Sequence, residues 1–330
     1  MKQLLKKIGF LILISSQLSA GEYADAFLLA NLHPQVYSMG FSTVATPVLG
    51  GHAMNNPAGF VNGAPISISL IYEQFNDLTQ SVGFEAKYGI SEKYDLGLTL
   101  INNSINDLYA RPNLSGLSPQ SRRDSVLSLA GSNSELINYR ESAAFLSLAR
   151  EFKFNIDLGW VYFKIPCRVP VGVSVKYIDK ILVENRGLGS GIDAGGQFFF
   201  NLGGMSDLLM NTEFSLGLML SDVLNTPVFW NSEHQDAIKR HTTFGISVEQ
   251  SIKKYGVVVS LSRARQERYD NDLQHGIQVK IKDLVYLRGG NDGTTTSFGL
   301  GIGLKKFIID YSFSRHELSD MQKIGINYQF

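Results

Sequence analysis

The chain has 330 residues, of which 44% are hydrophobic and 18% are charged, and its formal net charge is zero. The charged fraction lies below the roughly 25% that is usual in soluble domains, and without excess positive charge there is no basic field to attract nucleic acid. The chain contains 32 glycines, 20 phenylalanines and 14 tyrosines but only 2 tryptophans. Sparse charge with abundant Gly, Phe and Tyr favours a barrel whose outer wall faces lipid and carries aromatic girdles.

The first twenty residues have the pattern of a secretory signal peptide. Three lysines precede the apolar run Ile8–Ile14, and Ser19-Ala20 supplies the small residues of a cleavage site. The run is much shorter than the roughly 20 residues that a transmembrane helix needs, and no apolar run of about 18 residues follows it. We therefore predict that residues 1–20 are removed and that the exported chain, beginning near Gly21, is either soluble or a membrane-spanning barrel.

Residues 21–63 show no strand-like alternation. They contain short apolar patterns of helical spacing, the glycine pair Gly50-Gly51 and the turn motif Asn56-Pro57-Ala58-Gly59. Glycine and proline at these places do not suit a central membrane strand, yet the stretch is too apolar to remain in water. We therefore predict that residues 21–63 form a short, partly helical plug inside a barrel, and that the turn motif leads the chain into the first strand.

From Ala64 onward, segments of alternating apolar and polar residues repeat between turns, which is the spacing of β-strands with two unlike faces. Their lengths suit tilted crossings of a membrane. Fifteen candidates follow this pattern: Pro65–Phe75, Ser81–Tyr88, Tyr94–Asn102, Ser142–Phe152, Asn155–Ile165, Val169–Val183, Gly191–Asn201, Thr212–Asp222, Thr242–Ile252, Gly256–Ala264, Gln274–Lys282, Leu284–Gly290, Ser297–Lys305, Phe307–Arg315 and Gln322–Phe330. Because single-chain bacterial barrels have even strand numbers, we predict an all-β fold over residues 64–330, a transmembrane antiparallel β-barrel of about fourteen strands.

One long insertion, Asn103–Ile137, interrupts this rhythm and is rich in serine and asparagine. Outer-membrane barrels have long extracellular loops and short periplasmic turns. We therefore expect this insertion on the extracellular side.

The predicted hairpin Leu284–Lys305 has glycine at every second position of its returning strand. Gly299, Gly301 and Gly303 lie on the face opposite the apolar residues between them. Such a stripe leaves an inner wall bare, and we expect the segment Tyr37–Phe60 to pack against it. The spacing differs from that of a nucleotide-binding loop, and no helix follows it.

The chain ends on an alternating strand with Ile324, Ile326, Tyr328 and Phe330 on one face. An aromatic residue at the very end resembles the terminal strand of bacterial outer-membrane barrels. The resemblance implies that Ile326, Tyr328 and Phe330 form a signal for the barrel-assembly machinery. A half-buried strand closing a soluble sandwich has the same alternation, so a sandwich adhesin is the alternative fold.

Charges inside the predicted strands indicate which face is the lumen, because a charge on the lipid face costs roughly 2–4 kcal/mol at the midplane. We expect four such side chains to point inward: Lys176, Glu249, Lys280 and Asp310. They either line a polar path or form structural ion pairs that anchor the plug. We interpret Trp160 and Trp230 as anchors at the membrane interface.

No pattern of catalytic or metal-binding residues is visible. The six histidines are scattered, with no Gly-x-Ser-x-Gly elbow and no His-x-x-x-His pair. The single cysteine, Cys167, cannot form an internal disulfide and belongs to no metal-ligand pair. We predict no enzyme activity, no catalytic or metal-binding residue, no cofactor and no nucleic-acid partner.

Motifs spread along the mature chain occur in a recognisable order. They are Tyr37–Gly40, His52–Gly59, Gly172–Tyr177, Gly191–Gly195, Leu216–Leu218, Asp222–Trp230, Leu287–Gly290, Gly299–Gly301 and Ile309–Tyr311. In this order they resemble the outer-membrane family that groups the type IX secretion proteins PorV and PorQ, within the superfamily of the FadL fatty-acid channel.

This resemblance implies a component or adaptor of protein secretion or cell-surface assembly in the bacterial outer membrane, with secretion-system proteins as partners. The alternative, implied by the FadL superfamily, is a channel for uptake or export of hydrophobic small molecules. An apolar pocket between plug and wall would favour the channel, whereas loops packed into one large outward apolar patch would favour partner binding. Either reading requires contact with outer-membrane lipid and with the barrel-assembly machinery.

Overall fold

The computed structural model describes residues 27–28, 33–75, 79–105, 114–129, 137–159, 164–203, 210–267, 273–315 and 320–330. The predicted signal peptide, residues 1–20, lies outside these ranges, as does Trp160. The described strands are β1 (Ile66–Phe75), β2 (Thr79–Ser91), β3 (Tyr94–Ile105), β4 (Tyr139–Asp157), β5 (Lys164–Leu182), β6 (Asn185–Asn201), β7 (Thr212–Ser221), β8 (Thr226–Trp230), β9 (Gln235–Ile238), β10 (His241–Ile252), β11 (Val257–Gln266), β12 (Leu273–Ile281), β13 (Val285–Asn291), β14 (Thr296–Leu304), β15 (Phe307–Arg315) and β16 (Asp320–Gln329).

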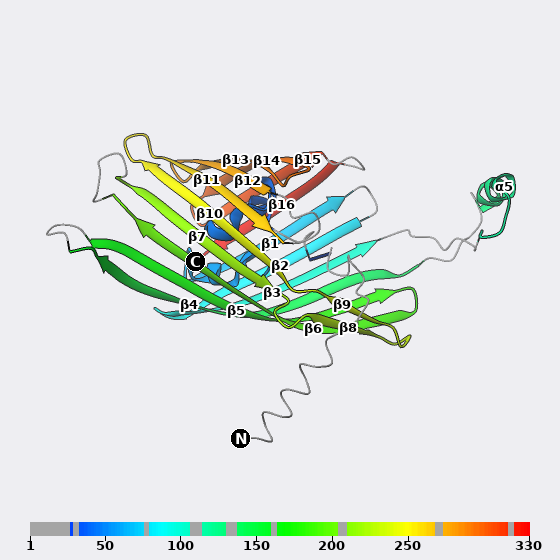
Figure 1. Ribbon diagram of the computed structural model, residues 1–330. Helices are drawn as coiled ribbons and strands as arrows, with labels where there is room; N and C mark the ends of the chain where they lie inside the picture. Colours follow the sequence, from blue (N-terminus) through cyan, green and yellow to red (C-terminus); the bar gives the residue numbers. More distant parts are fainter. Residues whose placement is uncertain are drawn as a thin grey trace, which may run out of the picture.

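All strands except β8 and β9 form one closed antiparallel sheet, in which each strand pairs with its neighbours along the chain (Figure 1). The last strand, β16, closes the barrel by pairing with β1, where Ile326 lies opposite Leu70. The backbone N–H of Phe330 donates to the carbonyl of Ile66 at 3.0 Å, which completes this seam. The prediction of an all-β antiparallel barrel of fourteen strands is confirmed.

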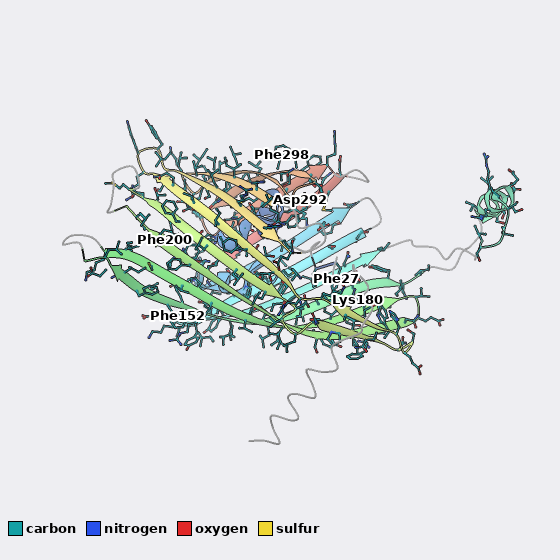
Figure 2. All side chains as sticks on the ribbon, in the orientation of Figure 1. Phe27, Phe152, Lys180, Phe200, Asp292 and Phe298 are labelled. Atoms are coloured by element: carbon teal, nitrogen blue, oxygen red, sulfur yellow. The ribbon has the colours of Figure 1, made fainter. Side chains whose placement is uncertain are left out.

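The barrel has its apolar side chains outside and its charged side chains inside. On β16, Ile324 and Ile326 are 46% and 41% exposed, whereas Lys323 and Asn327, which flank this pair, are each 1% exposed. Figure 2 shows the same outward direction for Phe152 on β4 and Phe298 on β14, which are 42% and 60% exposed. This pattern is the inverse of a soluble core and suits a wall in contact with lipid. The protein is a β-barrel of the bacterial outer membrane.

The two ends of the barrel differ in their connections. At one end, two-residue turns such as Glu92-Lys93 and Lys305-Lys306 join the strands, and the chain enters β1 and leaves β16. The other end carries the long connections 106–138 and 222–240. By the usual arrangement of such barrels, the first end is periplasmic and the second extracellular. No helix in the described ranges is long and apolar enough to cross a membrane.

Two sequence interpretations need correction. Asn155–Ile165 is not a strand of its own, because β4 runs to Asp157 and β5 begins at Lys164. Both strands are nineteen residues long, so their alternation continues almost to the turn between them and imitates an extra strand. Trp230 belongs to the hairpin β8–β9, which pairs with the extracellular part of β6, and its Nε1 donates to Asp236 at 2.8 Å. Its ring packs over Gly187 and against the buried apolar cluster that contains Val228, so it faces the barrel interior rather than lipid.

Short helices of the N-terminal segment lie in the lumen (Figure 1). They are α3 (Pro34–Ser38), the 3-10 helix η1 (Thr43–Ala45), α4 (His52–Asn55) and the 3-10 helix η2 (Pro57–Val61). Proline begins both α3 and η2, where its missing N–H costs no hydrogen bond and its fixed φ suits a helix. We call His33–Val61 the plug segment. A further helix, α5 (Pro119–Leu129), belongs to the extracellular connection between β3 and β4.

Candidate functional site

The turn motif Asn56-Pro57-Ala58-Gly59 lies inside the barrel and forms the start of η2, and the chain enters β1 only at Ile66. Asn56 is 1% exposed. Its Nδ2 donates to the carbonyls of Val44 at 2.9 Å and Gly196 at 3.2 Å, and its Oδ1 accepts from the N–H of Ala58 at 3.1 Å. One amide side chain therefore caps η2 and ties two parts of the plug segment to the wall.

Wall glycines surround the lumen where the plug segment touches it. A Cβ on Gly172 would lie 2.4 Å from the backbone carbon of Pro57, and one on Gly217 would lie 2.4 Å from the carbonyl oxygen of Val44. Both distances are far shorter than van der Waals contact, so only glycine admits the plug backbone at these positions. Besides Gly299, the other wall glycines whose missing Cβ makes room for the plug segment are Gly97, Gly195, Gly245, Gly276, Gly290 and Gly325.

The predicted glycine stripe divides between two kinds of neighbour. A Cβ on Gly299 would lie 2.5 Å from Cβ of Ser38 in the plug segment. The nearest neighbours of Gly301 are instead inward side chains of the wall, Asp310 first among them, and the nearest neighbour of Gly303 is the backbone of Asp283 in the β12–β13 turn. The stripe makes room for the plug at its first position and for wall groups at the other two.

Sequence reasoning missed most of the glycines that contact the plug segment, since each stands alone in its strand. Pairing register brings them together: Gly172 lies opposite Gly195, Gly217 opposite Gly245, and Gly276 opposite Gly290. These glycines could have been predicted by aligning the predicted strands side by side, because many strands then have a glycine on the inward face.

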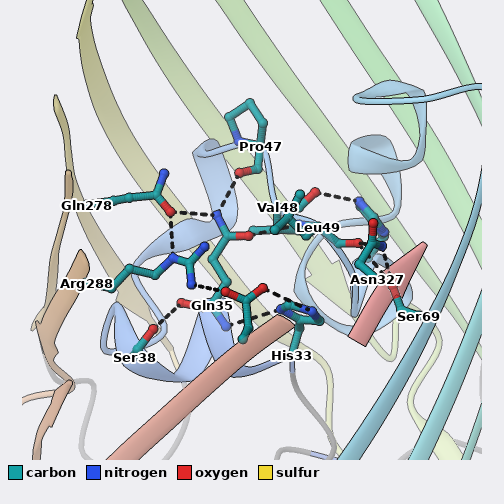
Figure 3. Close-up of polar contacts among 12 residues, drawn as sticks. His33, Gln35, Ser38, Pro47, Val48, Leu49, Ser69, Gln278, Arg288 and Asn327 are labelled. Carbon is teal, nitrogen blue, oxygen red and sulfur yellow. Dashed lines mark hydrogen bonds and ion pairs between the residues drawn. The ribbon is translucent and has the colours of Figure 1, made fainter. Parts of the chain in front are cut away.

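On the opposite wall, α3 docks through a buried polar network (Figure 3). Gln35 Nε2 donates to Gln278 Oε1 at 3.4 Å, and the same oxygen accepts from Arg288 Nε at 2.6 Å. Arg288 also forms an ion pair with Asp310, and both side chains are fully buried. Nε2 of His33 lies 3.9 Å from the second carboxylate oxygen of Asp310. The plug segment is thus fixed to a buried charge pair on β13 and β15.

His33 is held neutral by its surroundings. Burial lowers the pKa of His33 from 6.5 to about 4, more than the neighbouring Asp310 raises it, and Arg288 lowers it further. Its Nδ1 accepts from the N–H of Gln35 at 3.2 Å as the N-cap of α3. The hydrogen of the neutral ring therefore resides on Nε2, facing Asp310.

Tyr37 makes a second contact with the same wall. Its hydroxyl shares a hydrogen bond of 2.5 Å with that of Ser314, and Lys323 Nζ lies 4.3 Å from the centre of its ring. Lys323 in turn pairs with Glu73 at 2.7 Å. Burial raises the pKa of Tyr37 to about 12, so its hydroxyl stays protonated. The face of the neutral ring contacts the ammonium of Lys323.

A third polar contact joins α4 to β2. Glu85 accepts from the backbone N–H of His52 at 2.9 Å, and its other oxygen lies 2.6 Å from His52 Nδ1. Thr99 on β3 donates to Glu85 at 2.9 Å. Because Glu85 is buried, these contacts replace the water that a carboxylate would otherwise require.

The predicted assembly residues lie on the outer face of β16. Tyr328 has its ring centroid 4.5 Å from those of both Phe307 and Phe330, and Ile326 is exposed beside them. They form an apolar, partly aromatic edge at the seam of the barrel. Their recognition by an assembly machinery stays a prediction.

A small cavity of about 50 Å³ lies between the N-terminal segment and the wall, near the extracellular ends of β7, β10 and β11. Apolar side chains from both sides line it: Leu28 and Met54 from the N-terminal segment, and Phe145 and Met219 from the wall. The remaining lining is polar and consists of Lys176, Asp193, Ser221, Asp222, His241, Thr243 and Gln266. Sequence reasoning found only Lys176 among these residues.

The four mid-strand charges lie on the inner face. Lys176 is buried in the cavity wall, and Asp310 pairs with Arg288. Glu249 accepts from buried Ser260 at 3.0 Å, and Lys280 reaches Asp283 in the β12–β13 turn at 3.0 Å. In the described part of the chain, no group of three or more His, Cys, Asp or Glu side chains could hold a metal ion.

No protein-family model matches the chain, and no curated protein matches its sequence. The PorV/PorQ resemblance therefore stays a prediction. Among solved structures, the chain is similar to the toluene transporter TodX of Pseudomonas putida, with a TM-score of 0.47 and 10% identity over 92% of this chain and 99% of the transporter.

A FadL homologue of Pseudomonas aeruginosa gives a TM-score of 0.43 at 8% identity over 91% of this chain and 98% of the homologue. The KdgM porin in complex with disordered oligogalacturonate gives 0.34 at 9% identity over 80% of this chain and 99% of the porin. These three are transporters and porins rather than enzymes. Similarity at this level does not extend to the molecule transported.

Proposed function

We propose that this protein is an outer-membrane channel for small, largely hydrophobic molecules, and that the plug segment controls passage through it. The observation that carries the proposal is the cavity between the N-terminal segment and the wall, which has Leu28, Met54, Phe145 and Met219 on its apolar side. Ligand sites of this kind combine an apolar lining with a few polar groups that orient the ligand. The cavity lies near the extracellular end, where a molecule from outside would first meet the plug segment.

Passage requires the plug segment to shift, since its residues from His33 to Val48 are almost entirely buried against the wall. A disulfide between plug and wall should therefore close the channel. The hydroxyl oxygens of Ser42 in the plug segment and Ser262 on β11 are 2.6 Å apart, which is within reach of a cysteine pair. The matched control is Ser147 on β4 with Ser174 on β5, whose oxygens are also 2.6 Å apart but which both belong to the wall.

The experiment introduces each cysteine pair into a Cys167→Ser chain and follows uptake of N-phenyl-1-naphthylamine, an apolar fluorescent probe, by intact cells. Expression of the reduced protein should raise the uptake rate several-fold over cells without it. Oxidation of Ser42→Cys/Ser262→Cys should abolish this gain and a reductant should restore it, whereas oxidation of Ser147→Cys/Ser174→Cys should change nothing. Uptake that never exceeds that of cells lacking the protein would refute the channel.

The secretion adaptor of the PorV/PorQ type is the second candidate. The observation that favours it is α5, which lies apart from the barrel strands (Figure 1) and exposes 63% of Leu127 to solvent. Deleting residues 114–129 should remove proteins from the cell surface if α5 holds secretion partners. Unchanged surface proteins and unchanged probe uptake in that deletion would exclude the adaptor and leave the channel standing.

A further inference from the structure

The cavity wall holds a buried cluster of charges in which carboxylates outnumber cations. Lys176 Nζ lies 2.9 Å from Asp193 Oδ1 and 2.7 Å from Asp222 Oδ1. All three side chains are nearly inaccessible to water. Lys176 is the one ammonium among the eleven lining residues, so the lining holds one more carboxyl group than ammonium groups.

The geometry of Asp222 shows that the protein holds this excess charge in place. Its backbone has φ of +53°, a left-handed conformation that is uncommon outside glycine. Its backbone N–H donates to Asp193 Oδ1 at 2.7 Å, which locks the two carboxylates beside one ammonium. Unpaired charge is expensive to bury, and one lysine neutralises only one of the two groups.

Two polar atoms at the cavity have no hydrogen bond within the described structure. They are Oδ1 of Asp222, which contacts Lys176 as an ion pair but in no hydrogen-bond geometry, and Nδ1 of His241. Asp222 is 1% exposed and His241 is 8% exposed, and both line the cavity. A buried acceptor without a donor destabilises the folded protein. Both atoms can accept a hydrogen bond, so a donor with several N–H groups would satisfy them together.

We propose that this cavity binds the ammonium group of a small amphipathic amine, with the ammonium at Asp222 and His241 and the apolar part toward Met54, Phe145 and Met219. The inference deepens the proposed channel function, on which it rests, by naming the class of molecule. An ammonium supplies the missing positive charge and three donors. The size of the cavity suits a compact head group, with the rest of the molecule directed along the apolar lining.

The test measures binding to the purified full-length barrel in detergent by calorimetry, with n-butylammonium, n-butanol and butyrate as probes at equal ionic strength in sodium chloride. We expect the ammonium to bind at least tenfold more tightly than the alcohol and the butyrate not to bind. Equal affinity for n-butylammonium and n-butanol would overturn the proposal. So would a binding heat that sodium chloride alone reproduces.

Two variants with opposite expected signs separate binding from structural damage. Asp222→Asn keeps a residue that tolerates positive φ and should weaken n-butylammonium binding at least tenfold. Lys176→Met removes the ammonium that competes with the ligand for Asp193 and Asp222. This variant should therefore bind n-butylammonium more tightly, and bound n-butylammonium should raise its thermal stability. Asp157→Asn, at the exposed periplasmic end of β4, is the matched control and should bind like the unaltered protein.

Wild-type affinity in Asp222→Asn would refute the site even if Lys176→Met fails to fold. The outcomes also separate this site from the channel. Ammonium binding without probe uptake in cells would refute the channel and leave the site, whereas uptake without ammonium preference would refute the site and leave the channel.

Discussion

The two halves of the plug segment are held to the wall by different physics. The half that contains η1 and η2 lies against glycines of β5, β6 and β7, where Gly172 and Gly217 meet its backbone and Gly195 meets the side chain of Asn56. Its polar ties are Asn56 and the contact between His52 and Glu85 on β2. The half that contains α3 also has close glycine contacts, such as Gly290 with Met39 and Gly40, but its further attachment to β13, β15 and β16 is a set of buried charges, chiefly Arg288 with Asp310.

The η2 half is therefore attached mainly by rigid close packing, whereas the attachment of the α3 half depends on charge. Close backbone packing has no titratable part and tolerates no added atom. A buried charge network stays intact only while every member keeps its charge and its partner. We therefore expect the η2 half to fail through steric changes and the α3 half through changes of charge or pH.

The largest effect should come from adding one methyl group to the rigid half. Gly172→Ala would place Cβ 2.4 Å from the backbone of Pro57, which no side-chain rotation can relieve. We expect the folded fraction in outer membranes to fall several-fold, measured as the heat-modifiable band in unboiled gels.

The control for this change is Gly196→Ala on the neighbouring strand, where the nearest atom to the new Cβ would be 3.8 Å away. It adds the same methyl group to a strand of the same sheet and should assemble normally. A normal folded fraction for Gly172→Ala would show that the plug segment docks less tightly than this structure has it.

A smaller but still large effect should follow from breaking the charge pair of the other half. Arg288→Met leaves Asp310 buried without a partner, and we expect the free energy of unfolding to fall by about 3–5 kcal/mol. Urea unfolding of the barrel in lipid vesicles measures it.

The double variant Arg288→Met/Asp310→Leu sharpens the comparison. It removes both charges, so it should recover most of the stability that the single variant loses. If the double variant is as unstable as the single one, the network acts through its shape and hydrogen bonds rather than through charge, and the contrast between the halves is not electrostatic.

The sequence predicted the wall far better than the contents of the lumen. Strand alternation is a local property, and fourteen of the fifteen candidate segments correspond to strands of the barrel. The exception, Asn155–Ile165, spans a turn whose main local signal is Gly159 among apolar residues. Local patterns also indicated that residues 21–63 contain no strand.

The candidate site lay beyond such reasoning because it depends on register. Lys176, Asp193 and Asp222 come from three segments and meet only when β5, β6 and β7 pair as they do. Lys176 could be predicted to face inward from its own strand, but its two carboxylate partners could not. The hairpin β8–β9 was missed for a related reason, since its strands of five and four residues are too short to show periodicity.

The smallest predicted effect is the pH dependence that His33 gives to the α3 half. The pKa of His33 is about 4 in the docked state against an ordinary value of 6.5, so the undocked state takes up a proton first as the pH falls. Docking stability is therefore complete above pH 6.5, declines between 6.5 and 4, and loses at most about 3 kcal/mol by pH 4. The charged or titratable groups that face His33 are Asp310, Arg288, Glu85 and His52, and all four are present in both variants.

Protease sensitivity of the plug segment, followed from pH 7 to pH 4 in the folded barrel, measures this dependence. His33→Asn keeps a neutral N-cap for α3 and should remove the extra sensitivity below pH 6.5, while His234→Asn, in the exposed β8–β9 turn, should leave it unchanged. The carboxylates of the lumen contribute equally to both variants, so the difference between them isolates His33. Identical pH profiles for His33→Asn and the unaltered protein would mean that proton uptake by His33 does not weaken the attachment of the α3 half. That attachment would then be weakened only by loss of a partner in the Arg288–Asp310 pair.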